Sequence, residues 1–207
     1  MAHEQETASA YSTSGGALSI TSGRLSYTLG LVGPCYSIDT ACASTLAALH
    51  ACVLAVGVGE ECEAGAATGT KVLSEASNIA TAMGGMTSAY GRCHTFDRRA
   101  DGYCRGEGCG AFLVSARRER DDSRKLPAND MHVLASAVQQ DGPSASLTAP
   151  NGSSQRRLIE TVQRVIGPRK AFPTLEAHGT GTALGDPIEA RRPLPRLQEV
   201  RFWSSFA

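Results

Sequence analysis

Residues 37–56 limit the possible folds of this chain more than any other stretch. They read SIDTACASTLAALHACVLAV, in which a short alternating segment leads into a cysteine and then directly into an apolar run. Residues 35–39 mix β-prone residues with period-two alternation, which predicts a strand entering a packed sheet. The run after Cys42 has only three polar side chains, so it predicts a helix that is buried on nearly all sides. We therefore expect Cys42 at a corner between a strand and a buried helix.

This corner is a favourable position for a nucleophile. The first backbone N–H groups of a helix have no partners within the helix, and the macrodipole adds partial positive charge there. A cysteine at a helix N-terminus can have a lowered pKa, which makes the reactive thiolate available near neutral pH. Ala41, Ala43 and Ser44 are small, so a substrate carbonyl can approach Cys42. On this stretch alone, an inert cysteine in a core helix is an equally good interpretation.

Composition argues against several classes of function. The 207 residues suffice for one substantial domain or two small ones. Twenty basic and twenty acidic residues give a formal net charge of zero, which argues against a broad surface for nucleic acid or an anionic membrane. No apolar run approaches the length of a membrane span, and the N-terminal residues lack the pattern of a secretory signal. We therefore expect a cytoplasmic protein.

The seven cysteines predict reduced and mostly buried thiols. Their number is odd, and their spacing lacks the density of a small disulfide-rich secreted domain. Cys93, His94, Cys104 and Cys109 could be combined into a zinc site, but no pair has C-x-x-C spacing and the spacings fit no zinc template. We therefore expect no metal site.

Several other segments have recognisable periodicity. A helix is predicted from Leu18 until Gly30 ends it, and the clearest amphipathic helix covers residues 158–166. A short helix is expected at 76–83, and RGEGCG lacks the full pattern of a nucleotide-binding loop. The many Ala and Gly residues of 62–73 imply close packing against a neighbouring layer. Strands are expected at 62–73, 109–115, 131–138 and 173–177.

A second group of chemically active residues lies far along the chain. The last expected strand delivers His178 into the loop HGTGTALGDPIEA, whose glycines give its backbone unusual freedom. Thr180 and Thr182 offer hydroxyls along this loop. A histidine in such a loop is a better catalytic candidate than one on a helix face, and together with Cys42 it suggests thiol chemistry.

The same loop ends in DPIE, a pattern typical of a helix start. Asp186 is expected as the N-cap, Pro187 as the first helical residue and Glu189 as the residue that closes a capping box. The helix is expected to be short, because Pro193 and Pro195 follow where its interior would lie.

Four long motifs give the chain a specific resemblance. They are DTACAS around Cys42, FDRRADGYCRGEG from Phe96, LTAPNG from Leu147 and EAHGTGTALGDPIEA from Glu176. In this order, over residues 10–190, they resemble β-ketoacyl synthases, particularly the ketosynthase domains of modular polyketide synthases. The resemblance implies a thiolase-like α/β fold, a layered αβαβα arrangement of two similar halves that is incomplete here. It also implies decarboxylative Claisen condensation of acyl and malonyl thioesters in polyketide or fatty acid synthesis.

The resemblance also implies roles for individual residues. Cys42 corresponds to the nucleophile that accepts the acyl group from the 4'-phosphopantetheine arm of an acyl carrier protein. His178 corresponds to one of two histidines that assist decarboxylation of the malonyl group, and Thr180 and Thr182 correspond to threonines that bind the pantetheine arm. No cofactor of its own is implied for the enzyme. The implied partners are the carrier protein, the acyl and malonyl thioesters, and a homodimer or larger synthase assembly.

The chain departs from the family pattern at both ends. The family's first strand and helix have no counterpart before residue 10, and its lysine, second histidine and glycine-rich loop have none after residue 190. We therefore expect a partial ketosynthase domain over residues 1–190 and a divergent tail over 191–207. Three hypotheses stand: a ketosynthase that is impaired as an isolated chain, a non-catalytic fragment that binds acyl groups or carrier protein, and a hydrolase or simple acyltransferase using Cys42 and His178 alone.

Overall fold

The computed structural model describes residues 11–57, 62–116, 131–146, 148–167 and 175–191. The chain divides into two compact units. The first unit contains the chain up to Gly69 and resumes at Gly110, and the second contains Thr70–Cys109 and the chain from Asn129 onward. Cys42 therefore belongs to the first unit and His178 to the second.

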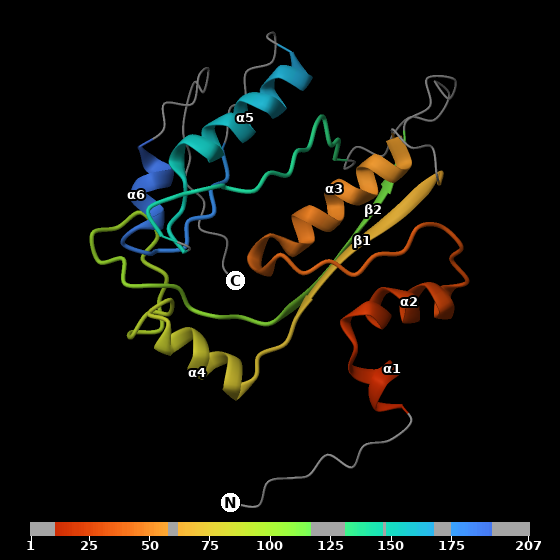
Figure 1. Ribbon diagram of the computed structural model, residues 1–207, viewed down its shortest axis with the longest axis horizontal. Coiled ribbons are helices and arrows are strands. Elements are labelled where there is room, and N and C mark those ends of the chain that lie inside the picture. Colours follow the sequence, from red (N-terminus) through yellow and green to blue (C-terminus); the bar gives the residue numbers. More distant parts are fainter. Residues whose placement is uncertain (1–10, 58–61, 117–130, 147, 168–174, 192–207) are drawn as a thin grey trace, which may run out of the picture. The chain divides into compact units, whose positions relative to one another are not determined.

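Helices form the first part of the first unit. In chain order they are α1 (Ser12–Gly16), α2 (Leu18–Leu29), the 3-10 helix η1 (Ala41–Ala43) and α3 (Ser44–Gly57) (Figure 1). The prediction of a helix from Leu18 that Gly30 ends is confirmed. Gly30 has φ 68°, a left-handed conformation that glycine adopts without steric cost and that commonly closes helices.

A two-stranded sheet of β1 (Ala64–Lys71) and β2 (Gly108–Ser115) follows. Both strands were predicted, and both are confirmed. A Cβ atom on Gly69 would overlap the side chain of Thr45 on α3, so the backbone of β1 approaches this helix closely. This contact confirms the prediction that the small residues of 62–73 pack tightly against a neighbouring layer.

The second unit contains α4 (Glu75–Met83), α5 (Gly152–Ile166) and α6 (Gly185–Ala190) (Figure 1). The predicted helices at 76–83 and 158–166 are confirmed. Asn151 caps α5, because its side chain accepts the N–H groups of Ser153 and Ser154. The start of α5 is therefore fixed by the asparagine of the LTAPNG motif.

Two charged side chains hold the segment between α4 and β2. Arg105 donates from Nη1 to Ser77 Oγ at 2.8 Å and to Asn78 Oδ1 at 2.6 Å, both on α4. Glu107 accepts the N–H of Leu73 at 2.7 Å. Because Leu73 follows β1 and Glu107 precedes β2, the two strands run in opposite directions. The RGEGCG segment thus has a structural role.

Three predicted strands are wrong. Residues 35–39, 131–138 and 175–177 have no strand hydrogen bonding, and Pro173 and Thr174 lie outside the described residues. A strand forms only where a neighbouring segment pairs with its backbone N–H and C=O groups. The sheet of the described residues consists of β1 and β2, so the predicted alternating segments have no neighbouring strand.

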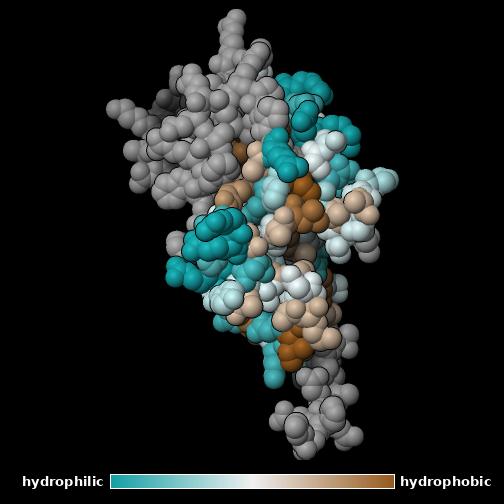
Figure 2. All heavy atoms as spheres, turned by 90° about the vertical axis from the view of Figure 1, so that its left-hand side faces the viewer, coloured by the Kyte–Doolittle hydropathy of each residue, from teal (hydrophilic) through white to brown (hydrophobic). Residues whose placement is uncertain are grey.

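The predicted burial of α3 is also wrong. Val56 is its one buried residue, at 5% exposure, whereas Leu46 is 70% exposed. An apolar helix is buried only as far as other elements cover it, and a two-stranded sheet covers little of its surface. Figure 2 shows further apolar residues, in brown, at the surface. Within the described part of the chain, no helix has the length and apolar character needed to cross a membrane.

Candidate active site

Cys42 is the middle residue of η1 and lies directly before α3. This confirms the predicted position at the start of a helix, although the segment before it is not a strand. Cys42 is exposed, so a substrate can reach it from solvent. The unpaired N–H groups and the dipole at the start of a helix supply partial positive charge at such a corner. The arrangement suits a nucleophile that attacks a carbonyl group.

The backbone before Cys42 is strained and is held by two polar side chains. Ala41 has φ 53°, a left-handed conformation that costs a non-glycine residue about 1 kcal/mol or more. Its N–H donates to Asp39 Oδ1 at 3.0 Å. Ser44 Oγ accepts the Thr40 N–H at 2.9 Å and donates to the Ala41 carbonyl at 2.7 Å. These three hydrogen bonds fix the corner.

Asp39 and Ser44 were not predicted from the sequence as residues that hold the corner. A signal was present, because an Asp side chain often accepts the N–H of the residue two positions later and stabilises a turn. In DTACAS, Asp39 stands two residues before Ala41. The motif therefore contains both the nucleophile candidate and the acceptor that fixes its backbone.

His178 lies in a loop whose backbone is held by a side chain of α6. The His178 N–H donates to Glu189 Oε1 at 3.0 Å, and the Gly179 N–H donates to Glu189 Oε2 at 2.8 Å. Gly179 has φ 57°, where a side chain would add strain. His178 is an exposed residue. One carboxylate thus orients the backbone from which the imidazole projects.

Asp186 connects this loop to the segment that contains Phe96. It is 4% exposed, its Oδ1 accepts the Gly181 N–H at 3.0 Å, and its Oδ2 accepts the Phe96 N–H. Phe96 has φ 56°, which is strained for a residue with a large side chain. The buried carboxylate therefore satisfies two backbone donors and holds a strained conformation in place.

The predicted capping roles in DPIE are wrong. α6 begins at Gly185, its N-cap is Leu184, and no side chain caps it. Pro187 is consequently the third residue of the helix, not the first. Glu189 accepts two N–H groups of the loop instead, and Asp186 accepts one from the loop and one from Phe96, because these backbone donors have no other acceptor within the secondary structure.

Thr180 and Thr182 form a hydroxyl pair beside His178. Their Oγ1 atoms lie 3.1 Å apart, and the Gly185 N–H donates to Thr182 Oγ1 at 3.0 Å. Whichever threonine donates within the pair, one hydroxyl hydrogen is left for another acceptor. Both residues are half-buried, so a ligand can reach this donor.

The other thiols differ from one another in their environment. Hydrogen bonds from Ser22 and Ser26 lower the pKa of Cys35, and Ser26 Oγ lies 3.4 Å from its Sγ. Burial, followed by the nearby Cys62 thiol, raises the pKa of Cys52. The prediction of mostly buried cysteines is wrong, since five of the seven are exposed, for the same lack of covering elements that exposes α3. Within the described residues, no three His, Cys, Asp or Glu side chains are grouped to hold a metal ion.

Two family models match this chain. The model of the β-ketoacyl synthase N-terminal domain matches residues 1–120, and the model of the β-ketoacyl synthase C-terminal domain matches residues 131–194. The chain belongs to the β-ketoacyl synthase family. The first match includes Cys42 and the second includes His178. This ketosynthase chain therefore has one candidate catalytic residue in the region matched by each family model.

Curated relatives of this ketosynthase chain are very long synthases. It is 42% identical over 198 residues to the spectinabilin polyketide synthase system protein NorA' of Streptomyces orinoci, a match that covers 94% of this chain and 5% of the relative. It is 40% identical over 197 residues to the erythronolide synthase EryA2 of Saccharopolyspora erythraea, a match that covers 92% of this chain and 5% of that relative. The chain therefore spans about one-twentieth of the length of these relatives.

Solved ketosynthase domains share the fold. The oxazolomycin ketosynthase domain of Streptomyces albus JA3453 is 35% identical with a TM-score of 0.73, and the match covers 84% of this chain and 31% of that one. The ketosynthase from module 6 of the bacillaene synthase of Bacillus subtilis 168 is 33% identical with a TM-score of 0.69, covering 85% and 32%. The predicted thiolase-like α/β fold, present in part, is confirmed. That Cys42 and His178 act together in thiol chemistry stays a prediction, because they belong to different units.

Proposed function

We propose that this chain contributes to a β-ketoacyl synthase that condenses acyl and malonyl thioesters in polyketide or fatty acid synthesis. The observation that carries the proposal is the position of Cys42, exposed in η1 at the start of α3, in a chain that belongs to this family. In this proposal Cys42 is the nucleophile, His178 assists the second half-reaction, and Thr180 and Thr182 bind the pantetheine arm.

In the first half-reaction the Cys42 thiolate attacks the carbonyl carbon of an acyl thioester. A new C–S bond forms at Cys42, the C–S bond to the pantetheine breaks, and the pantetheine sulfur takes up a proton. The tetrahedral intermediate carries negative charge on oxygen, which the N–H groups at the start of a helix can stabilise. The bonds that Asp39 and Ser44 make to the backbone hold this corner in place before the substrate arrives.

In the second half-reaction a malonyl thioester loses CO₂, and its enolate attacks the acyl group on Cys42. The new C–C bond forms as the C–S bond to Cys42 breaks, so the thiolate is regenerated. His178, as a neutral imidazole, would donate a hydrogen bond to the thioester oxygen on which the enolate charge develops. The Glu189 carboxylate supports this role, since it holds the backbone of His178 and Gly179.

The proposed partner is an acyl carrier protein, whose 4'-phosphopantetheine arm presents both thioesters. The hydroxyl hydrogen left in the Thr180 and Thr182 pair is suited to an amide carbonyl of that arm. We further propose a cytoplasmic location, a homodimer or larger synthase assembly, and a ketosynthase part that ends near residue 190, with residues 191–207 as a divergent tail.

The first half-reaction can be tested on the 207-residue chain. The protein is incubated with an acyl thioester of pantetheine, and intact mass and peptide mapping locate the added acyl group. We expect one acyl group on Cys42, no acylation in Cys42→Ala, and unchanged acylation in Cys35→Ala, which removes an exposed thiol whose pKa is lowered.

The outcomes separate the three hypotheses. A stable acyl group on Cys42 that is not passed on supports the ketosynthase, whereas repeated turnover identifies a hydrolase if free acid is released and a simple acyltransferase if the acyl group moves to another thiol acceptor. Absence of acylation in a chain that is folded by circular dichroism identifies a non-catalytic fragment. Equal labelling of several cysteines would show that Cys42 is not a selective nucleophile.

A further inference from the structure

The second unit contains a cavity that the steps proposed above do not use. Its volume is about 860 Å³, and it is lined by a single stretch of chain between residues 90 and 99. The lining includes the polar and charged side chains of Tyr90, Arg92, His94, Asp97 and Arg99. A cavity with this lining is suited to a charged ligand.

The stretch that lines the cavity has a fixed conformation. Thr95 Oγ1 donates to the Gly179 carbonyl at 2.7 Å, and the Phe96 N–H donates to the buried Asp186 carboxylate. Phe96 itself has a strained φ of 56°, and the next residue, Asp97, lines the cavity. Such strain persists only where the surrounding contacts fix it, and it is concentrated at functional sites. The cavity is therefore preformed.

The lining of the cavity has more positive than negative side chains. Asp97 uses both carboxylate oxygens for Arg99, with Nε to Oδ1 at 2.9 Å and Nη2 to Oδ2 at 3.0 Å. Arg92 has no acidic partner among the described residues, and it is an exposed residue of the lining. The neutralised pair and the unpaired Arg92 leave one net positive charge, which selects for an anion.

His94, one of the lining residues, has a ring nitrogen without a partner. His94 Nδ1 is buried and makes no hydrogen bond. An unsatisfied buried polar atom costs about 1 to 3 kcal/mol, and native proteins rarely keep one without a reason. A ligand oxygen in the cavity would satisfy this nitrogen once the ring turns it toward the ligand.

We propose that this cavity binds a phosphate group. A phosphate carries several oxygens, so one can accept from the planar guanidinium of Arg92 while another approaches the ring of His94, which lines the same cavity. The cavity exceeds the size of inorganic phosphate, so a phosphate ester with an organic part fits it. The identification of this ester as the phosphopantetheine arm rests on the proposed function, whereas the phosphate site itself does not.

Calorimetric titration of the 207-residue chain with three compounds tests this proposal. The compounds are inorganic phosphate, phosphopantetheine and pantetheine, which lacks the phosphate. We expect both phosphate compounds to bind, and pantetheine to bind at least about tenfold more weakly than phosphopantetheine, the factor for one lost charge-assisted hydrogen bond. Binding of inorganic phosphate without a gain for phosphopantetheine over pantetheine would support the site and reject the pantetheine arm as its source.

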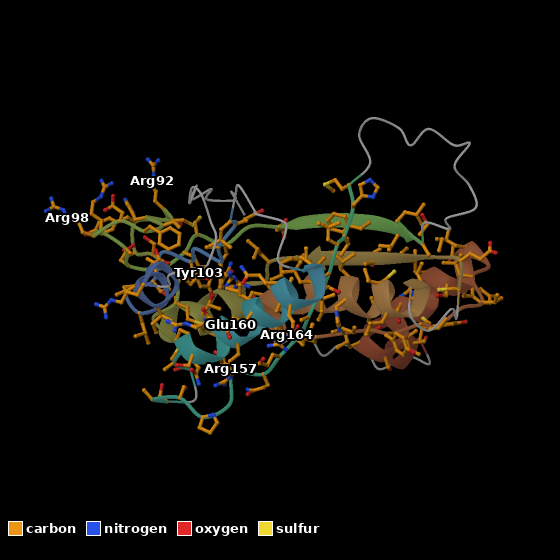
Figure 3. The ribbon with its side chains drawn as sticks, turned by 90° about the horizontal axis from the view of Figure 1, so that it is seen from above. Arg92, Arg98, Tyr103, Arg157, Glu160 and Arg164 are labelled. Carbon is orange, nitrogen blue, oxygen red and sulfur yellow. The ribbon has the colours of Figure 1, made fainter. Side chains whose placement is uncertain are left out.

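Variants at two arginines of the same stretch localise the binding. Arg92→Gln should weaken the binding of both phosphate compounds about tenfold or more and leave pantetheine unchanged. Arg98→Gln is the matched control, because Arg98 does not line the cavity and Figure 3 shows it projecting away in a different direction from Arg92. Equal losses in the two variants would reduce the effect to general electrostatics and overturn the proposal.

A second measurement covers the case in which Arg92→Gln does not fold. Phosphate should shift the NMR resonances of the His94 ring in the unmodified chain and in Arg92→Lys, and it should leave the other histidine rings unchanged. Absence of any phosphate-dependent shift at His94 would overturn the site. Acylation of Cys42 is measured separately, so failure of the phosphate site and failure of the proposed function are distinguishable.

Discussion

Replacing Asp186 with asparagine tests whether its carboxylate joins the His178 loop to the Phe96 segment. Asp186 is 4% exposed and accepts one backbone N–H on each oxygen, from Gly181 and from Phe96. A hydrogen bond to a charged group contributes about 1.5 to 3 kcal/mol. The asparagine amide retains one acceptor and turns its NH₂ group toward the other N–H, so one bond is lost and the remaining one loses its charge. We expect Asp186→Asn to lower the free energy of unfolding by about 2 to 4 kcal/mol.

Urea denaturation followed by far-UV circular dichroism measures this change. Glu160→Gln is the control, because Glu160 is an exposed acid on α5 (labelled in Figure 3) and its neutralisation should change stability by about 0.5 kcal/mol or less. A domain typically has about 5 to 15 kcal/mol of stability, so the expected loss is a large fraction of the total.

Hydrogen exchange shows where stability is lost. In Asp186→Asn the N–H groups of Gly181 and Phe96 should exchange faster, because they lose the acceptor that now protects them. Equal stability of Asp186→Asn and Glu160→Gln, with unchanged exchange at Gly181, would refute the reasoning. It would mean that neighbouring contacts hold the two segments without the carboxylate.

The chain alone should form no β-ketoacyl product from an acyl primer and malonyl carrier protein, because its sequence contains one identifiable histidine of the family's pair. A product by mass spectrometry that Cys42→Ala abolishes would contradict this. Hydrogen bonds from Ser22 and Ser26 lower the pKa of Cys35, so Cys35 should react with iodoacetamide at lower pH than an ordinary thiol. Ser26→Ala should move its rate profile to higher pH, and an unchanged profile would exclude the Ser26 bond as a contributor. Hydrogen bonds from Arg99 hold the pKa of Asp97 well below its usual 3.8, so this carboxylate stabilises the fold above about pH 4 and less as the pH falls. The stability difference between the unmodified chain and Asp97→Asn in urea should therefore shrink on acidification, and a constant difference would exclude the ion pair as its source.

Helices were predictable because their signals are local. Gly30 ends α2, and the period of apolar residues gives α5, without any information about distant segments. Strands were not predictable in the same way, because alternation at 35–39 or 131–138 predicts only that a segment could pair with a neighbouring strand. Whether it does depends on a neighbouring strand, and the described residues contain two strands that pair with each other.

Burial was predicted poorly for a related reason. The composition of α3 shows that it is apolar enough for an interior, but the exposed fraction depends on what covers it. Leu46 at 70% exposure is the consequence in a chain that matches about a third of each solved ketosynthase domain. The same argument applies to the cysteines. Cysteine is a residue type that is often buried, but most of the cysteines in this chain are exposed.

The reactive residues of the candidate site were predictable from the sequence, whereas the residues that hold its backbone in place were not. DTACAS and the His178 loop were identified because nucleophilic and basic side chains in such settings are chemically distinctive. Asp186 and Glu189 were assigned to capping, since DPIE matches a local helix-start pattern. Their actual acceptor roles depend on backbone donors that the fold brings to them, which sequence spacing does not encode.

Both units hold a strained backbone residue in the same way. Among the described residues, Ala41 and Phe96 are the non-glycine residues with positive φ, and the N–H of each donates to a carboxylate, Asp39 in one unit and Asp186 in the other. A strained peptide is retained only if its hydrogen bonds contribute more than the strain costs, and a charged acceptor provides the strongest such bond. Ala41 directly precedes the candidate nucleophile, and Phe96 lies within the stretch of chain that lines the cavity of the second unit. The carboxylates thus act on backbone geometry rather than on substrate, which explains why neutralising them should alter local order before it alters any chemical step.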